Sequence, residues 1–306
     1  MSTHHPETSH PLDPFTASEL TQAVALLRDS KNVSEAARFS MALPVEPSKE
    51  FVQNFKAGDD FVREIRLVGY DPETTKSFDS RISLDQEKLL GFEAIEGAHA
   101  PLNMMDFIRV IQIVKEDPGW QAAMRKRGVD DFSLVQIDPW PAGGFPPDEI
   151  PEGTRMMRAI SFVREFATDN GYARPVEGLI AFVDLEKECV ARLDDYGVVA
   201  LPKEPGNYDP DSVGTLRQDL RPIEITQPEG PSFEVDGHAI RWQKWDFRIS
   251  LHPVHGLVLH DLGYEDKGRL RKILHRAALS DMVVPYGDTS PMHDWKHVFD
   301  ASELGM

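Results

Sequence analysis

The sequence predicts an α+β protein with two small domains, each a helix followed by an antiparallel sheet, and then the opening strands of a large all-β domain. Two observations carry this prediction. An amphipathic helical segment followed by short apolar, β-branched segments occurs twice, about a hundred residues apart. From residue 205 onward, apolar and polar side chains instead alternate along short segments, and frequent prolines and glycines separate these segments. This pattern is typical of strands.

The first predicted domain opens with a helix over residues 15–30. Thr16 and Glu19 have the spacing of a capping box, in which each side chain satisfies a backbone amide of the other. One apolar stripe runs along this segment: Leu20, Val24 and Leu27. Strand-like segments follow between turn formers such as Gly91: residues 36–43, 61–69, 77–84 and 92–95. The stripe therefore has a sheet face to cover.

The second predicted domain repeats this order after a boundary near residues 97–101. A helix is expected over residues 104–116, and Pro118 begins another that ends before Gly128. Four strand-like segments come next: residues 133–137, 156–166, 179–185 and 189–193.

In the third region, residues 244–251 alternate apolar and polar side chains, which predicts a strand with one solvated face. Residues 257–264 form the expected returning strand. Two more strands are expected at residues 232–235 and 282–285, and a helical turn at residues 270–279. The chain stops before a sheet of this size could close, so we expect a truncated domain with unpaired edges.

Composition narrows the function classes. The formal charge is −18, from 33 Lys plus Arg against 51 Asp plus Glu, and it disfavours nucleic acid and membrane surfaces as partners. No apolar run reaches the ~18 residues of a spanning helix, and the N-terminus lacks a secretion signal. The single cysteine, Cys189, is expected to be buried on a strand in a protein of a reducing, cytoplasmic compartment.

One possible metal motif is the pair His293 and His297, which imitates the zinc-binding H-E-x-x-H pattern with Asp294 in place of glutamate. Asp294 has a shorter side chain than the base of that motif, and Pro291 disfavours the long helix it needs. A zinc hydrolase is therefore a minor alternative, which predicts bound zinc.

Five other histidines are expected to have no specific role. His252 and His255 are predicted in a solvent-facing hairpin turn. His4, His5 and His10 are predicted in a disordered start.

The glycine pair at residues 143–144 is followed by two prolines and is predicted to lie in a loop. A phosphate-binding glycine loop joins a strand to a helix, and this pair does not have such neighbours. No P-loop, dinucleotide-binding or G-x-S-x-G pattern occurs in the chain, which weakens nucleotide-binding and serine-hydrolase interpretations.

The most specific motifs follow one another near the end of the chain. They are Arg-Pro-Ile at 221–223, Gln-Pro-Glu-Gly-Pro-Ser-Phe at 227–233, Arg-Trp-Gln-Lys-Trp at 241–245, Gly-Leu-Val-Leu-His-Asp at 256–261, Tyr-Glu-Asp at 264–266 and Met-Val-Val-Pro-Tyr-Gly-Asp at 282–288. His-Pro-Leu-Asp-Pro at 10–14 and Tyr-Ala-Arg-Pro-Val-Glu-Gly at 172–178 support them. The chain thereby resembles the copper-dependent, topaquinone-containing primary amine oxidases.

This resemblance implies two small cystatin-like domains before a large catalytic β-sandwich that forms a homodimer. It implies an N2-like domain at residues 10–99, an N3-like domain at residues 100–205 and the truncated start of the sandwich at residues 206–306.

The resemblance also implies site residues. Asp300 lies in Phe-Asp-Ala-Ser-Glu, which resembles the segment of the catalytic aspartate, the proton-abstracting base. Tyr286 matches the tyrosine that hydrogen-bonds the quinone, and Val298 takes the place of an aromatic gate residue in the substrate channel. In the family, a primary amine condenses with the quinone to a Schiff base whose Cα proton a carboxylate removes. Burial would raise the pKa of such a carboxyl and make it a better base.

Two requirements of the family are not met by this chain. Its quinone forms from the tyrosine of a Thr-x-x-Asn-Tyr-Asp/Glu motif, whereas Tyr208 has Glu204 at the threonine position and prolines around it, so we expect a coincidental match in a linker. Its copper needs a His-x-His pair, which the chain lacks. We therefore expect no copper or topaquinone on this chain alone and no turnover of primary amine and O2. A non-catalytic binding or dimerisation module built from these domains is the alternative.

Overall fold

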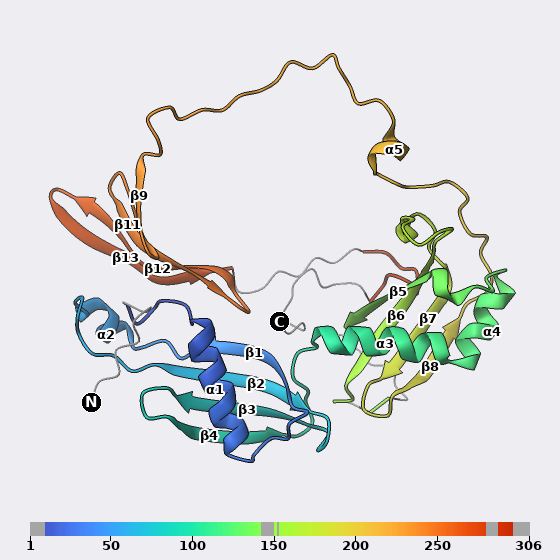
Figure 1. The fold of residues 1–306 in the computed structure, drawn as a ribbon, viewed down its shortest axis with the longest axis horizontal. Coiled ribbons are helices and arrows are strands. Elements are labelled where there is room, and N and C mark those ends of the chain that lie inside the picture. The colour runs from blue at the N-terminus through green and yellow to red at the C-terminus, as the bar shows by residue number, and fades with distance from the viewer. Residues whose placement is uncertain (1–9, 142–149, 152, 280–286, 296–306) are drawn as a thin grey trace. The chain divides into compact units, whose positions relative to one another are not determined.

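The computed structural model describes residues 10–141, 150–151, 153–279 and 287–295 (Figure 1). The chain divides into two compact units. One contains the described residues up to Pro101 together with 226–279, and the other contains 102–225 together with 287–295. Among the described residues, no helix is both long and apolar enough to cross a membrane.

The first unit begins with helix α1 (Ala17–Asp29), which packs on one face of a four-stranded antiparallel sheet (Figure 1). The strands are in the order β1-β2-β3-β4. They span Arg38–Pro44, Glu64–Asp71, Lys76–Ser83 and Lys88–Ile95. The predicted helix and strands are confirmed, and Gly91 lies within β4 instead of ending a turn. The short helix α2 (Lys49–Asn54), capped by Ser48, was not predicted.

The face of helix α1 toward the sheet is shifted from its predicted apolar stripe, since Val24 and Leu27 pack on the core but Leu20 does not. Its fully buried side chains are Glu19, Ala23 and Leu27, whereas Leu20 is 38% exposed. The reason is an ion pair beneath the helix. Arg63, 3% exposed just before β2, donates from Nε to Glu19 Oε1 at 2.9 Å and from Nη2 to Oε2 at 3.0 Å. A buried carboxylate needs such a partner, so the pair sets the rotation of α1.

The second unit contains helices α3 (Met104–Glu116) and α4 (Pro118–Lys126), as predicted. Its antiparallel sheet has the order β5-β6-β7-β8. The strands span Val135–Pro141, Met156–Val163, Leu179–Asp184 and Cys189–Asp195. Arg155, just before β6, forms a buried ion pair with Asp106 in the first turn of α3. The second domain therefore repeats the helix-to-strand ion pair of the first.

The likeness of the two small domains extends to irregular details. The pairing of the last two strands shifts register between Arg81 and Ile82 in the first sheet and between Phe182 and Val183 in the second. The turn that joins those strands contains a residue with positive φ at the same place: Glu87 at 49° and Glu188 at 53°. The same fold thus occurs twice.

The third region forms a five-stranded antiparallel sheet of order β13-β12-β11-β10-β9 in the first unit. Its strands span Phe233–Asp236, Ala239–Trp242, Trp245–His252, Gly256–Asp266 and Arg269–Ala278. The helical turn expected at residues 270–279 is wrong. This segment is strand β13, because it pairs along most of β12, and pairing with a neighbouring strand overrides local helix propensity.

Cys189 was expected to be buried and is exposed. It is the first residue of β8, which is an edge strand of its sheet with no fully buried residue.

A glycine substitution tests the packing of the first sheet. A Cβ on Gly69 of β2 would collide with the carbonyl oxygen of Arg38 and lie 2.5 Å from Cζ of Phe78, whereas one on Gly91 would meet nothing within 4 Å. We expect Gly69→Ala to destabilise the first domain by about 2 kcal/mol or more and Gly91→Ala to change its stability by less than ~0.5 kcal/mol. Native-state hydrogen exchange of the β2 amides measures both, and equal effects would contradict this packing.

Candidate functional site

The three site residues predicted from the family resemblance, Tyr286, Val298 and Asp300, lie outside the described residues, as do His4, His5, His297, the strand at residues 282–285 and the glycine pair at residues 143–144. The structure therefore gives no geometry for them. It does describe the segment 287–295, which leads toward Val298 and Asp300.

The segment 287–295 belongs to the second unit and packs there against the core of the β5–β8 sheet. Met292 is 6% exposed. The ring of Trp295 lies edge-on to Trp140, with centroids 5.9 Å apart, and the guanidinium carbon of Arg158 is 4.7 Å from the Trp295 ring. Stacking and cation–π contacts of this kind hold an aromatic side chain in place. The chain is thus fixed on the second domain three residues before Val298.

The zinc interpretation finds no support in the described residues. His293 lies in a turn, where its amide donates to the carbonyl of Ser290 at 2.8 Å, and no helix is assigned over 291–295. Across the described ranges, no three His, Cys, Asp or Glu side chains come together in a way that could hold a metal ion.

Tyr208 lies in a linker, as predicted, and is 84% exposed. Its neighbour Asn207 fixes this linker to the second domain, where Nδ2 donates to Asp169 Oδ1 at 3.0 Å and Oδ1 accepts from the Asn170 amide at 2.8 Å. Asp209 caps the four-residue helix α5 (Pro210–Val213). The Asn-Tyr-Asp sequence is thus explained by local structure.

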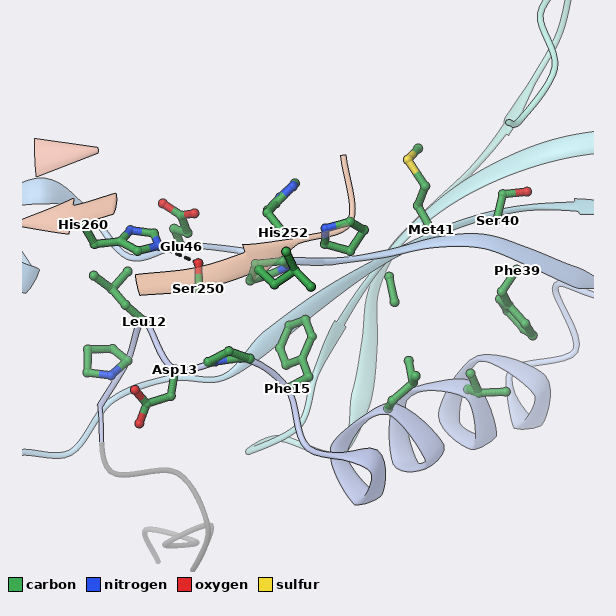
Figure 2. Close-up of a pocket in the computed structure, with 18 residues that line it drawn as sticks. Leu12, Asp13, Phe15, Phe39, Ser40, Met41, Glu46, Ser250, His252 and His260 are labelled. Atoms are coloured by element: carbon green, nitrogen blue, oxygen red, sulfur yellow. Dashed lines mark hydrogen bonds between the residues drawn. The ribbon is translucent and has the colours of Figure 1, made fainter. Parts of the chain in front are cut away.

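A cavity in the first unit lies between the α1–β1 side of the first domain and strands β11 and β12 (Figure 2). Its volume is about 490 Å³. Most of its lining is apolar and includes Leu20 and Val24 of α1, of which Val24 also packs against the core of the first domain. Apolar enclosure of this size is typical of small-molecule sites.

A row of basic side chains crosses the sheet beside this cavity. Arg248 of β11, His260 of β12 and Arg276 of β13 are directly paired across the strands. This face was predicted to be solvated, but His260 is only 2% exposed because the first domain covers it. Two carboxylates of that domain neutralise the arginines: Asp13 pairs with Arg248, and Glu46 accepts from Arg276 Nε at 3.0 and 3.1 Å.

Two members of this row have a buried nitrogen without a hydrogen-bond partner among the described residues, Nε of Arg248 and Nδ1 of His260. His260 Nε2 lies 2.7 Å from Ser250 Oγ (Figure 2). Burial lowers the pKa of His260, and Arg276 lowers it further against an opposing effect of Glu46. The lowered pKa favours the neutral imidazole, whose Nδ1 is enclosed by protein atoms.

Two histidines near the cavity differ from their prediction. His252 and His255 are half-buried, not solvent-facing, and their rings stack with centroids 4.4 Å apart. His252 Nδ1 accepts from the amides of Val254 and His255 at 3.1 and 3.2 Å. Burial, followed by His255 and Arg276, lowers the pKa of His252 to about 4.

His10 also has a specific role, contrary to prediction. Its Nδ1 accepts from the Leu12 amide at 3.1 Å, and its ring lies 4.9 Å from that of Phe55. Burial and then Arg248 lower the pKa of His10 to about 4. The segment 10–14 is thus ordered, and its residues 11–14 line the cavity.

Three family models match the chain in sequence order. They are the AGAO-like N2 domain at residues 16–90, the copper amine oxidase N3 domain at residues 105–210 and the copper amine oxidase enzyme domain at residues 234–306. Together they cover most of the chain, and the chain belongs to the copper amine oxidase family.

Individual relatives agree with the family models. A primary amine oxidase of Arthrobacter sp. (strain P1) is 40% identical over 299 residues, which cover 97% of this chain and 45% of the relative. A histamine oxidase of Arthrobacter globiformis is 38% identical over 303 residues, covering 98% and 44%. The crystal structure of a copper-containing benzylamine oxidase from Hansenula polymorpha matches with a TM-score of 0.79 and 25% identity, covering 97% and 48%. The chain thus spans less than half the length of these relatives.

The lowered pKa of His252 predicts how stability depends on pH. The unfolded side chain has a pKa near 6.5 and the folded one about 4, so the unfolded state binds more protons between these values. The first unit should lose stability as the pH falls from about 6.5 to about 4. In His252→Asn, whose amide oxygen can replace Nδ1 as the acceptor, calorimetry should show a smaller loss than in the wild type.

The matched control is His293→Asn in the second unit, which should leave this pH dependence unchanged. An equal loss of stability in wild type and His252→Asn would show that His252 does not contribute to it.

Proposed function

We propose that residues 1–306 act as part of a copper-dependent primary-amine oxidase that converts a primary amine, O2 and water to an aldehyde, ammonia and hydrogen peroxide. The ordered match of all three regions to copper amine oxidase domains carries the proposal. The relatives named as primary amine, histamine and benzylamine oxidases support a primary amine as the substrate. The homodimer and the cytoplasmic location expected from the sequence belong to the same proposal.

The residues described here do not fit a copper site. Among them no suitable group of three His, Cys, Asp or Glu occurs, and the whole sequence has no His-x-His. In this proposal, copper and topaquinone are held by polypeptide other than residues 1–306. The quinone would supply the electron sink for amine oxidation, and the present residues would supply proton transfer and positioning.

The proposed base is Asp300, which would remove the proton from the amine carbon next to nitrogen. A carboxylate suits this role when it is shielded from water, because burial raises its pKa toward the working pH. Val298 would widen the substrate channel relative to relatives with an aromatic side chain there, and Tyr286 would hydrogen-bond a quinone oxygen.

The second domain supports this assignment through the chain that precedes Asp300. Trp295 and Met292, five and eight residues before Asp300, are packed on the β5–β8 sheet. Fixing the backbone close to a reacting group limits its range of positions, and such restriction contributes to catalysis.

The net charge of −18 also favours a cationic substrate such as a primary ammonium ion. Because this attraction acts over a long range, salt should weaken it.

A substitution of Asp300 tests the proposal in the complete oxidase that it requires. Asp300→Asn should lower kcat for benzylamine or phenethylamine by about 100-fold to 10,000-fold, measured as hydrogen peroxide formed, because the base is lost. Asp294→Asn, six residues earlier and exposed, should leave kcat within about twofold.

Residues 1–306 alone, supplied with copper, should form no peroxide and give no quinone stain. Peroxide formation by this chain alone would contradict the proposed division of roles, and normal turnover by Asp300→Asn would contradict the assignment of the base. A soluble 206–306 region that resists proteolysis, combined with no amine turnover by the complete protein, would favour the non-catalytic module.

A further inference from the structure

We propose that the contact between the first domain and the β9–β13 sheet is a pH-dependent clamp, closed while His10, His252 and His255 are neutral and opened when they are protonated. All of these groups lie in the first unit, and none is assigned to amine oxidation, so the clamp does not depend on the proposed function. It also goes beyond a general loss of stability in acid, because the first domain itself stays folded when the clamp opens.

The clamp consists of two ion pairs. Asp13, before α1, pairs with Arg248 of β11, and Glu46, after β1, pairs with Arg276 of β13. The two arginines and His260 form the row across the sheet that the first domain covers. The four side chains of these pairs are at most 27% exposed, and a charge acts more strongly where water is largely excluded. A new positive charge beside either pair should therefore weaken it.

Each of the three histidines accepts a hydrogen bond at Nδ1, which only an unprotonated nitrogen can do. His10 Nδ1 accepts from the Leu12 amide at 3.1 Å. His252 Nδ1 accepts from two amides of its own turn at 3.1 and 3.2 Å. His255 Nδ1 accepts from Arg276 Nη2 at 3.0 Å, because a guanidinium can only donate. Protonation of Nδ1 would make each of these acceptors a donor that points at another donor.

His10 lies beside the first ion pair. Burial and then Arg248 lower the pKa of His10 to about 4, and His260 acts in the same direction, whereas Asp13 and Asp261 oppose them. Asp13 is already paired with Arg248. A proton on His10 thus adds a second positive charge at this pair and weakens the attachment of the sheet.

His252 and His255 lie beside the second ion pair, with their ring centroids 4.4 Å apart. Burial, followed by His255 and Arg276, lowers the pKa of His252 to about 4, with His260 acting in the same direction and Glu46 opposing. Glu46 is already paired with Arg276. A proton on His255 Nδ1 would face the Arg276 guanidinium, break their hydrogen bond and repel the arginine from its place at Glu46.

The sign of the effect follows from proton binding. In the closed clamp His10 and His252 bind protons only near pH 4, whereas a released histidine binds one near pH 6.5. The open state therefore binds more protons between these values, and acid favours it. A comparison of pH 7 with pH 5 lies within this range and above the ordinary pKa of carboxyl groups, which is about 4.

Cysteine labelling of the 306-residue chain tests the opening. In a Cys189→Ser background, Val258→Cys places a thiol on β12, on the same face as His260 and at a side chain 0% exposed. Val68→Cys makes the same change on β2 inside the first domain, at a side chain 5% exposed. The labelling rate with 4,4′-dithiodipyridine is divided by the rate for glutathione at the same pH. From pH 7 to pH 5 this ratio should rise at least tenfold at residue 258 and less than twofold at residue 68.

Substitution of the histidines tests their role. Asparagine Oδ1 can accept where each histidine uses Nδ1, but asparagine does not titrate. In the Val258→Cys protein, His10→Asn, His252→Asn and His255→Asn should each reduce the acid-induced rise at least twofold. His293→Asn, in a turn of the second unit, should leave it unchanged. Circular dichroism at pH 7 identifies the folded variants, and these are compared.

Three results would contradict the clamp. Labelling at residue 258 that is already fast at pH 7, or that does not rise by pH 5, would overturn the proposal. A parallel rise at residue 68 would show that acid unfolds the whole domain, and it would overturn the proposal as well. An unchanged rise in every folded histidine variant would overturn the role of the histidines.

Discussion

A buried arginine joins the first turn of the helix to the start of a strand in each small domain, and the rest of each domain depends on this contact. Glu19 and Asp106 each complete a capping box at their helix and also accept from Arg63 or Arg155. One carboxylate thus satisfies a helix amide and a buried guanidinium together. Since neither charge can be buried alone, only one rotation of the helix over its sheet satisfies both.

That rotation connects the small domains to the candidate sites. In the first unit it leaves Leu20 partly exposed in the cavity wall, beside Val24, which also packs against the core. Asp13 and Glu46 of the same domain then neutralise the arginine row of the third sheet. In the second unit the same architecture presents a sheet core on which Met292 and Trp295 pack. Each small domain thus holds a segment of the region that matches the enzyme domain of the family.

Secondary-structure elements with local causes could be predicted from the sequence, whereas contacts between distant segments could not. Capping boxes, period-two alternation and proline or glycine breaks predicted α1, α3, α4 and most strands, because their causes lie within a few residues. Strand β13 was missed because its partner β12, and not its own composition, decides its conformation. The buried role of His260 was missed for a similar reason. The alternation of residues 244–251 defines a polar face, but the carboxylates that cover it, Asp13 and Glu46, are more than 200 residues away. The motifs around Tyr286 and Asp300 identified the family, but the geometry at these residues stays a prediction.

A double-mutant cycle between Asp106 and Arg155 tests the helix-to-strand ion pair most directly. Asp106→Ala, Arg155→Ala and the double variant can be compared by native-state hydrogen exchange of the α3 amides, which reports the stability of the second domain. Each single change should destabilise the domain by about 3 kcal/mol or more, and the double change by little more than either one, giving a coupling of at least ~1.5 kcal/mol. Effects that add to within about 0.5 kcal/mol would show that the two side chains act independently and would contradict the central role of the pair.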